Sequence, residues 1–173
     1  LTLTELAARQ SRRDPGGVSA TLDEVREEVQ STISGLRELV NGIRPPALAD
    51  RGLSAALDDR FTRLPQSVHL DLGDGADRRW PPQVEAALYF VACEAVSNAL
   101  KHAPTSSVRV RFTADDVGPR LQVADNGPGF DTDHGGAGLR GLKDRVESLG
   151  GRFKVDSGAG GTVLTAEISG RPG

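Results

Sequence analysis

Four short polar or glycine-rich blocks lie between residues 94 and 162, and each stands where a segment of helical or strand-like periodicity begins or ends. Because each block fixes the end of one element and the start of the next, their order constrains the fold more than any other feature does. Each block alone is a weak signal. The blocks cover residues 94–102, 125–130, 136–139 and 158–162.

The periodicity around the blocks predicts alternating helices and strands. Helices are expected at about residues 53–64, 82–101 and 139–149, and strands at about residues 67–72, 107–113, 120–124, 152–156 and 162–168. The strands alternate between apolar and polar residues, which indicates one buried and one wet face. We therefore expect an α+β two-layer sandwich, with helices on one face of a mixed, largely antiparallel sheet.

The first 44 residues carry a different pattern. Apolar residues from Val18 to Ile43 recur at spacings of three and four, which predicts a long helix that Pro45 and Pro46 end. A shorter helix is expected over residues 1–12. A two-helix hairpin cannot bury such a seam well alone, so two copies are expected to form a dimeric four-helix bundle. Packing of the seam on the chain's own globular part is the alternative.

Composition sets bounds on the class of protein. The chain has 173 residues, 37% hydrophobic and 26% charged, which is enough for one core with an appendage. Its net charge of −3 gives no reason to expect direct nucleic-acid binding. The single cysteine, Cys93, fits a reducing, cytoplasmic compartment. No apolar run is long enough to span a bilayer, and the missing initiating Met suggests a fragment whose sensory or membrane part lies upstream.

The first block forms a polar stripe on an otherwise apolar helix. Glu94, Asn98, Lys101 and His102 fall at i, i+4, i+7 and i+8, so they lie along one side of the helix. A carboxylate and an amide one turn apart suit a Mg²⁺ ion that also binds phosphate oxygens, and the two basic residues could donate to those phosphates. A solvated helix face explains the same pattern equally well.

The second block begins with Asp125 at the end of the alternating run 121–124. Gly127 and Gly129 permit positive φ and close approach of the backbone. A carboxylate at a strand end, beside bare backbone, can accept a hydrogen bond from an exocyclic amine. Asn-Gly-Pro-Gly is also typical of an ordinary turn, which is the simpler interpretation of this block alone.

The third and fourth blocks are rich in glycine. Gly136 and Gly138 lead into the amphipathic helix expected at residues 139–149, and unpaired amides at a helix N-terminus favour anions such as phosphate. The block does not match a complete Gly-x-Gly-x-x-Gly or Walker pattern. Residues 158–162 precede a strand, and taken alone they indicate a hairpin turn.

Together and in this order, the four blocks resemble the N, G1, G2 and glycine-threonine boxes of the histidine-kinase branch of the Bergerat-fold (GHKL) ATPases. Residues 36–48 with Gly52 and Leu53, and residues 139–146, resemble the subfamily whose partners are NarL-type response regulators. The resemblance covers nearly the whole chain. It implies a truncated dimerisation hairpin at residues 1–50 and a catalytic ATP-binding domain at residues 51–173.

The resemblance also implies roles for single residues. Asp125 would hold the adenine amine and favour ATP over GTP, while Thr162 would close the far side of the adenine pocket. Asn98 would ligate Mg²⁺ and Glu94 would hold the metal or its water, so these two would be the catalytic pair. The other residues implied to contact ATP are Lys101, His102, Gly127, Gly129, Gly136, Gly138 and Leu139.

Two features depart from the family pattern. The phosphoacceptor histidine normally lies on the first bundle helix, but the histidines here are His69, His102 and His134. We therefore expect the acceptor upstream of Leu1 and a fragment that cannot phosphorylate itself. The lid-like segment, residues 131–135, is short and leaves little chain to cover ATP.

The resemblance thus predicts the ATP-binding part of a bacterial two-component sensor histidine kinase, which transfers the ATP γ-phosphoryl group to a histidine for relay to an aspartate of a response regulator. One alternative is another GHKL-type ATPase or an anti-sigma serine kinase, which the helical seam disfavours. The other is a non-catalytic dimerisation module with a degenerate pocket, which intact Glu94, Asn98 and Asp125 disfavour.

Overall fold

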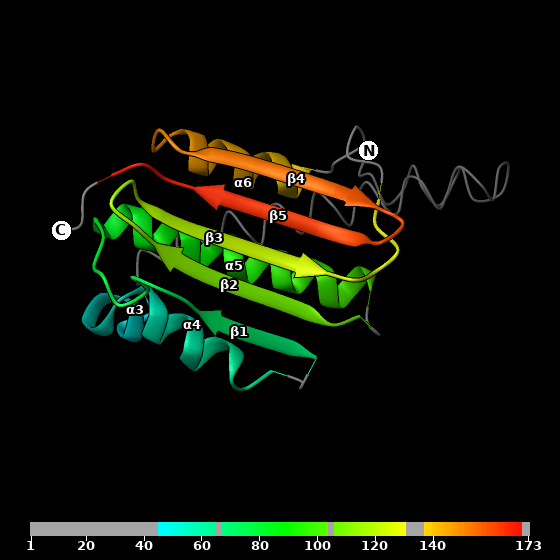
Figure 1. Ribbon diagram of the computed structural model, residues 1–173, viewed down its shortest axis with the longest axis horizontal. Helices are drawn as coiled ribbons and strands as arrows, with labels where there is room; N and C mark the ends of the chain where they lie inside the picture. Colours follow the sequence, from blue (N-terminus) through cyan, green and yellow to red (C-terminus); the bar gives the residue numbers. More distant parts are fainter. Residues whose placement is uncertain (1–44, 65–66, 104–105, 131–136, 171–173) are drawn as a thin grey trace, which may run out of the picture. The chain divides into compact units, whose positions relative to one another are not determined.

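The computed structural model describes residues 45–64, 67–103, 106–130 and 137–170 (Figure 1). The chain divides into two compact units, one formed by Leu1–Gly42 with Gly136–Gly138 and the other by Ile43–Gly135 with Leu139–Gly173. The helical hairpin expected at the N-terminus lies outside the described residues. The described residues belong to the second unit, apart from Ala137 and Gly138 at the start of helix α6 (Ala137–Glu147).

A five-stranded mixed sheet forms one layer of this unit, with strand order β1-β2-β3-β5-β4. β1 pairs with β2 in parallel, and all other neighbours are antiparallel. The predicted mixed, largely antiparallel sheet is confirmed. The strands are β1 (Val68–Leu72), β2 (Val108–Ala114), β3 (Pro119–Asp125), β4 (Arg152–Gly158) and β5 (Gly161–Glu167).

Helices cover one face of the sheet and leave the other to solvent (Figure 1). Along β2, Val108, Val110 and Phe112 are fully buried, whereas Arg109 and Arg111 between them are exposed. The predicted two-layer sandwich is therefore confirmed, because a sheet covered on one side alternates in this way. The helices are α3 (Pro46–Arg51), α4 (Leu53–Phe61), α5 (Pro82–His102) and α6 (Ala137–Glu147).

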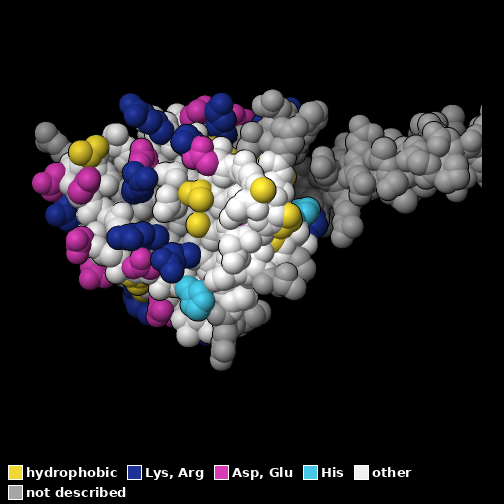
Figure 2. Space-filling view, turned by 45° about the vertical axis from the view of Figure 1, so that its right-hand side comes forward, with side chains coloured by type: hydrophobic (Ala, Val, Ile, Leu, Met, Phe, Trp, Pro, Cys, Tyr) yellow, Lys and Arg dark blue, Asp and Glu magenta, His cyan; other side chains and the backbone are white. Residues whose placement is uncertain are grey.

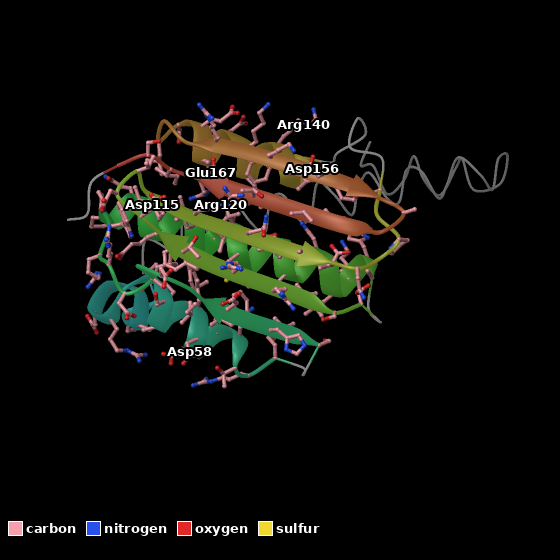
Figure 3. All side chains as sticks on the ribbon, in the orientation of Figure 1. Asp58, Asp115, Arg120, Arg140, Asp156 and Glu167 are labelled. Carbon is pink, nitrogen blue, oxygen red and sulfur yellow. The ribbon has the colours of Figure 1, made fainter. Side chains whose placement is uncertain are left out.

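The wet face of the sheet carries charges of both signs, interspersed over the surface shown in Figure 2. Arg120 of β3 and Glu167 of β5 are paired across the sheet, with Nη1 and Oε1 2.5 Å apart (Figure 3). Arg111 and Asp71 pair at 3.6 Å on β2 and β1. Cross-strand pairs of this kind are typical of a solvated sheet face.

Helix α3 is an element that the sequence interpretation missed. The two prolines were expected only to end the preceding helix, but Pro46 occupies the first turn of a new one, where a missing N–H costs nothing. Leu48 is buried in the core. Gly52, with φ of 87°, separates α3 from α4 and allows the sharp change of direction between them.

Helix α6 ends as its sequence predicts. Gly150 has φ of 72°, and its N–H donates to the carbonyl of Glu147 while the N–H of Gly151 donates to Val146. This pair of hydrogen bonds is the Schellman motif that closes many helices. Leu142 and Val146 are buried, so the apolar stripe of α6 packs into the core as expected.

Candidate functional site

The strand register places three polar side chains in one row at the end of the sheet. Asp125 of β3 lies opposite Thr162 of β5, and Thr162 lies opposite Ser157 of β4. Directly opposed residues point to the same side of a sheet. Asp125 is also paired with Val108, which is fully buried beneath the helices. The row Asp125–Thr162–Ser157 therefore lies on the helix-covered face, and all three residues are half-buried.

The turn after β3 is shaped by the Asp125 carboxylate and lies against the end of α5. Oδ1 of Asp125 accepts a hydrogen bond from the N–H of Gly127 at 2.8 Å. A Cβ on Gly127 would lie 2.5 Å from the Cβ of Ala103, the residue that follows α5. The glycine of the second block thus lies against the residue that directly follows the first block.

The same turn also packs against the β4–β5 hairpin. Gly129 has φ of 69°, and a Cβ there would lie 2.1 Å from the carbonyl oxygen of Gly158. Gly161 has φ of 121°, and a Cβ there would lie 1.9 Å from the carbonyl oxygen of Asp125. Only glycine fits at both positions. The second and fourth blocks therefore meet backbone to backbone.

Two hydrogen-bonding side chains at this junction were not assigned from the sequence. The Asn126 Oδ1 accepts from the N–H of Ser107 at 2.8 Å, which ties the turn to the segment before β2. The Ser157 Oγ accepts from the N–H of Phe130 at 2.9 Å and lies 3.0 Å from the Thr162 Oγ1. The pairing of Ser157 with Thr162 follows from the register of the β4–β5 hairpin, which the sequence alone does not give.

The polar stripe of the first block lies on α5 as the spacing predicts. Glu94 and Asn98 are half-buried, while Lys101 and His102 are exposed in the last turn, where positive charge also complements the helix dipole. One carboxylate and one amide a turn apart offer hard oxygen ligands of the kind that Mg²⁺ takes together with phosphate and water. The donor set therefore fits a magnesium-bound nucleotide.

The third block is only partly described. Gly136, His134 and the segment 131–135 lie outside the described residues. Gly138 is exposed in the first turn of α6, and Leu139 after it is half-buried and packs against the core. Within the described part of the chain, no three His, Cys, Asp or Glu side chains gather into a site that would hold a metal ion without a nucleotide.

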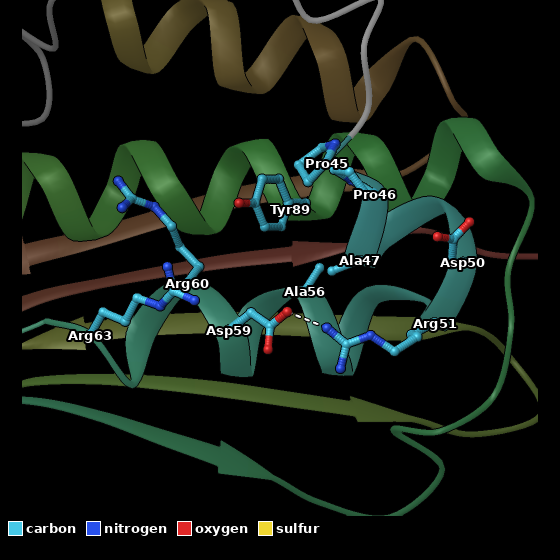
Figure 4. A pocket seen from close by; sticks show the side chains of 10 residues that line it. All are labelled: Pro45, Pro46, Ala47, Asp50, Arg51, Ala56, Asp59, Arg60, Arg63 and Tyr89. Carbon is cyan, nitrogen blue, oxygen red and sulfur yellow. Dashed lines mark hydrogen bonds and ion pairs between the residues drawn. The ribbon is translucent and has the colours of Figure 1, made fainter.

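A groove of about 480 Å³ lies elsewhere, between α3, α4 and α5, and no residue of the four blocks lines it (Figure 4). Arg51 and Asp59 form an ion pair beside it. Burial raises the pKa of Tyr89, one of the lining residues, to about 12, and it also raises the pKa of the neighbouring Cys93 thiol.

Comparisons with known proteins agree with the fold. The family model described as "Histidine kinase-, DNA gyrase B-, and HSP90-like ATPase" matches residues 83–171, and a model described as "Histidine kinase" matches residues 1–48. The chain belongs to this family of ATPases. None of the described helices is both long and apolar enough to cross a membrane.

Individual relatives are sensor histidine kinases. The sensor histidine kinase MctS of Rhizobium johnstonii is 31% identical over 171 residues, which is 94% of this chain and 37% of the relative. The signal transduction histidine-protein kinase/phosphatase DegS of Bacillus subtilis is 37% identical over 140 residues, 72% of this chain and 36% of the relative. The chain thus spans little more than a third of the length of these relatives.

A solved structure shows the same fold. The histidine kinase domain of the blue-light activated histidine kinase of Erythrobacter litoralis EL346 superimposes with a TM-score of 0.51 at 22% identity. The match covers 66% of this chain and 61% of that chain. The two family models and the relatives, not this structural match, confirm the predicted assignment to the histidine-kinase branch of these ATPases.

Proposed function

We propose that this chain is the ATP-binding catalytic part of a bacterial two-component sensor histidine kinase. The observation that carries the proposal is the row Asp125–Thr162–Ser157, which lies at the junction where the turn after β3 meets the end of α5. Residues 1–50 are the dimerisation hairpin in this proposal, and a NarL-type response regulator receives the phosphoryl group.

The adenine base lies against Asp125 and Thr162 of this row in the proposal. The Asp125 Oδ1 is already used by the N–H of Gly127, which leaves Oδ2 to accept from the adenine amine. Because an ionised carboxylate only accepts hydrogen bonds, this position favours a base with an exocyclic amine. The packed glycines hold the turn, so the carboxylate is oriented before the nucleotide binds.

The phosphate side of the site is assigned to α5 and the start of α6. Asn98 and Glu94 would hold the magnesium ion, which neutralises charge on the phosphates when it is bound. Lys101 and His102 would face the phosphates, and the amides at Gly136, Gly138 and Leu139 would bind them. Catalysis then depends mainly on positioning and charge neutralisation by these groups.

Calorimetric titration of Mg-ATP into the wild-type chain and Asp125→Asn tests the adenine assignment. The amide retains an oxygen for the N–H of Gly127 but presents a donor in place of Oδ2. A lost charged hydrogen bond of about 1–3 kcal/mol corresponds to a roughly 5- to 150-fold weaker Kd. Asp156→Asn, an exposed carboxylate on β4, is the matched control and should bind like wild type.

A second experiment separates a histidine kinase from another ATPase of the same fold. The chain is mixed with a full-length relative whose own ATP site is inactivated, and labelled phosphate on histidine is measured. Acid-labile phosphate that depends on Asn98 and Asp125 supports the proposal. ATP hydrolysis with no phosphohistidine would instead favour a GHKL-type ATPase, and phosphate stable to acid would favour a serine kinase.

A further inference from the structure

Ser157 joins two segments of the site through one side chain. Its Oγ accepts a hydrogen bond from the N–H of Phe130, at the end of the turn after β3, and lies 3.0 Å from the hydroxyl oxygen of Thr162 on β5. These are the two hydrogen bonds that the Ser157 hydroxyl makes with described residues. Its position, opposite Thr162 in the β4–β5 register, is fixed by the sheet.

The chemistry of these groups sets a direction for the hydrogen bonds. The N–H of Phe130 can only donate, so the Ser157 Oγ must accept there and keeps its own proton to give. If that proton goes to the Thr162 Oγ1, the Thr162 hydroxyl becomes an acceptor toward Ser157 and keeps its own proton for a third group. Hydrogen bonds in such a chain strengthen one another.

In the proposed complex the third group is the adenine base, which would lie against Thr162 and Asp125, direct neighbours across β5 and β3. Asp125 accepts only, and Thr162, oriented in this way, donates. Adenine presents an amine donor beside the ring acceptor N1, which matches that pair. Guanine presents the opposite order, an oxygen acceptor beside an N–H donor, and would leave both protein groups unpaired.

We propose that Ser157 is a positioning residue that determines nucleotide specificity, because it sets the Thr162 hydroxyl to donate toward N1 of the adenine base. This inference rests on the proposed function of the site as an ATP pocket. Ser157 does not touch the base itself, and it acts through Thr162.

The test compares ATP with 1-deaza-ATP, in which N1 is replaced by C–H while the amine is kept. Dissociation constants are measured with magnesium for the wild-type chain and for Ser157→Ala, Ser157→Thr and Ser157→Cys. The wild-type chain should bind 1-deaza-ATP about fivefold more weakly than ATP, the value of one neutral hydrogen bond. In Ser157→Ala that ratio should fall toward one, and Ser157→Thr should restore it.

A merely structural role for Ser157 gives a different result. If Ser157→Ala only loosened the hairpin, it would weaken the binding of ATP and 1-deaza-ATP alike. The ratio of the two dissociation constants would then stay at the wild-type value, which overturns the inference. Ser157→Cys keeps nearly the same volume with a weak S–H donor, and its ratio should be intermediate, so the test survives if Ser157→Ala fails to fold. Ser148→Ala removes a hydroxyl that donates to the carbonyl of Arg145, and should change neither constant.

Two outcomes separate this inference from the proposed function. The proposed function stands, but the role of Ser157 is overturned, if Asp125→Asn weakens ATP binding and the wild-type chain binds ATP and 1-deaza-ATP equally well. A wild-type chain that binds no ATP, or binds it equally well in Asp125→Asn, overturns both.

Discussion

The guanidinium of Arg79 and the carboxylate of Glu85 form a clamp at the start of α5. Arg79 Nε donates to Glu85 Oε1 at 2.9 Å and its Nη2 donates to Oε2 at 3.3 Å. The Glu85 side chain is only 2% exposed, and it also accepts from the N–H of Trp80 at 3.0 Å. Arg79 Nη2 reaches the carbonyl of Ala49 as well, so the pair ties α3 to α5. The hydrogen bond and the charge of Glu85 raise the pKa of Arg79.

Glu85→Ala should lower the free energy of unfolding by on the order of 2 kcal/mol, because it leaves the buried N–H of Trp80 without an acceptor. Urea denaturation followed by circular dichroism measures the change. Glu147→Ala, which removes an exposed carboxylate from α6, is the control and should stay within about 0.5 kcal/mol of wild type. Equal stability of the two variants would show that the clamp contributes nothing.

Gly52→Ala should be destabilising by about 1–3 kcal/mol, since a side chain at φ of 87° is strained and its Cβ would lie 2.8 Å from the Cδ of Arg79. Gly141→Ala is the matched control. Gly141 lies within α6 with open space around its Cβ position, so alanine there should stabilise the protein by up to about 1 kcal/mol. The two glycines should therefore respond with opposite signs in the same thermal denaturation experiment.

The pKa of Tyr89 can be measured from phenolate absorbance, because Tyr89 is the single tyrosine of the chain. Burial is the main cause that raises this pKa to about 12, from the ordinary tyrosine value of 10.0. The unfolded chain ionises first, so the stability linked to Tyr89 is fully present below pH 10 and is lost as the pH rises toward 12. Phenolate absorbance should therefore rise at higher pH in native protein than in denaturant, and coincident curves would contradict the buried environment.

The sequence was sufficient wherever the signal was local. Alternating side chains located β2 and β3, and the apolar spacing of α6 with Gly150 at its end predicted both the helix and its cap. Asp125 was placed at a strand end by the same reasoning. These features depend on residues a few positions apart, so periodicity and turn chemistry are enough to identify them.

The features that were missed depend on contacts distant in sequence. The first turn of α3 begins with Pro46, and a proline after a long helical pattern was interpreted as an end and not as a start. The link from Ser157 to Phe130 joins residues 27 positions apart and requires the strand register. The close approach of Gly129 to Gly158 is likewise invisible in a sequence, where each glycine has the same appearance as a turn residue.

The contact between the β4–β5 hairpin and the turn after β3 gives a last prediction. A Cβ on Gly161 would lie 1.9 Å from the carbonyl oxygen of Asp125, with φ of 121°, so alanine must push the hairpin away from the turn. Asp125 and Thr162 would then separate at the proposed adenine site. Gly161→Ala should weaken Mg-ATP binding about tenfold, since the loss of one or two hydrogen bonds to the base, at about 1 kcal/mol each, has an effect of that size.

The neighbouring glycine supplies the control. Gly160 has open space around its Cβ position, so Gly160→Ala changes the same hairpin without the clash and should bind Mg-ATP like wild type. Thermal denaturation of both variants separates a local shift from unfolding of the domain. If Gly161→Ala is folded and binds ATP as tightly as Gly160→Ala, the nucleotide does not lie against Asp125 and Thr162.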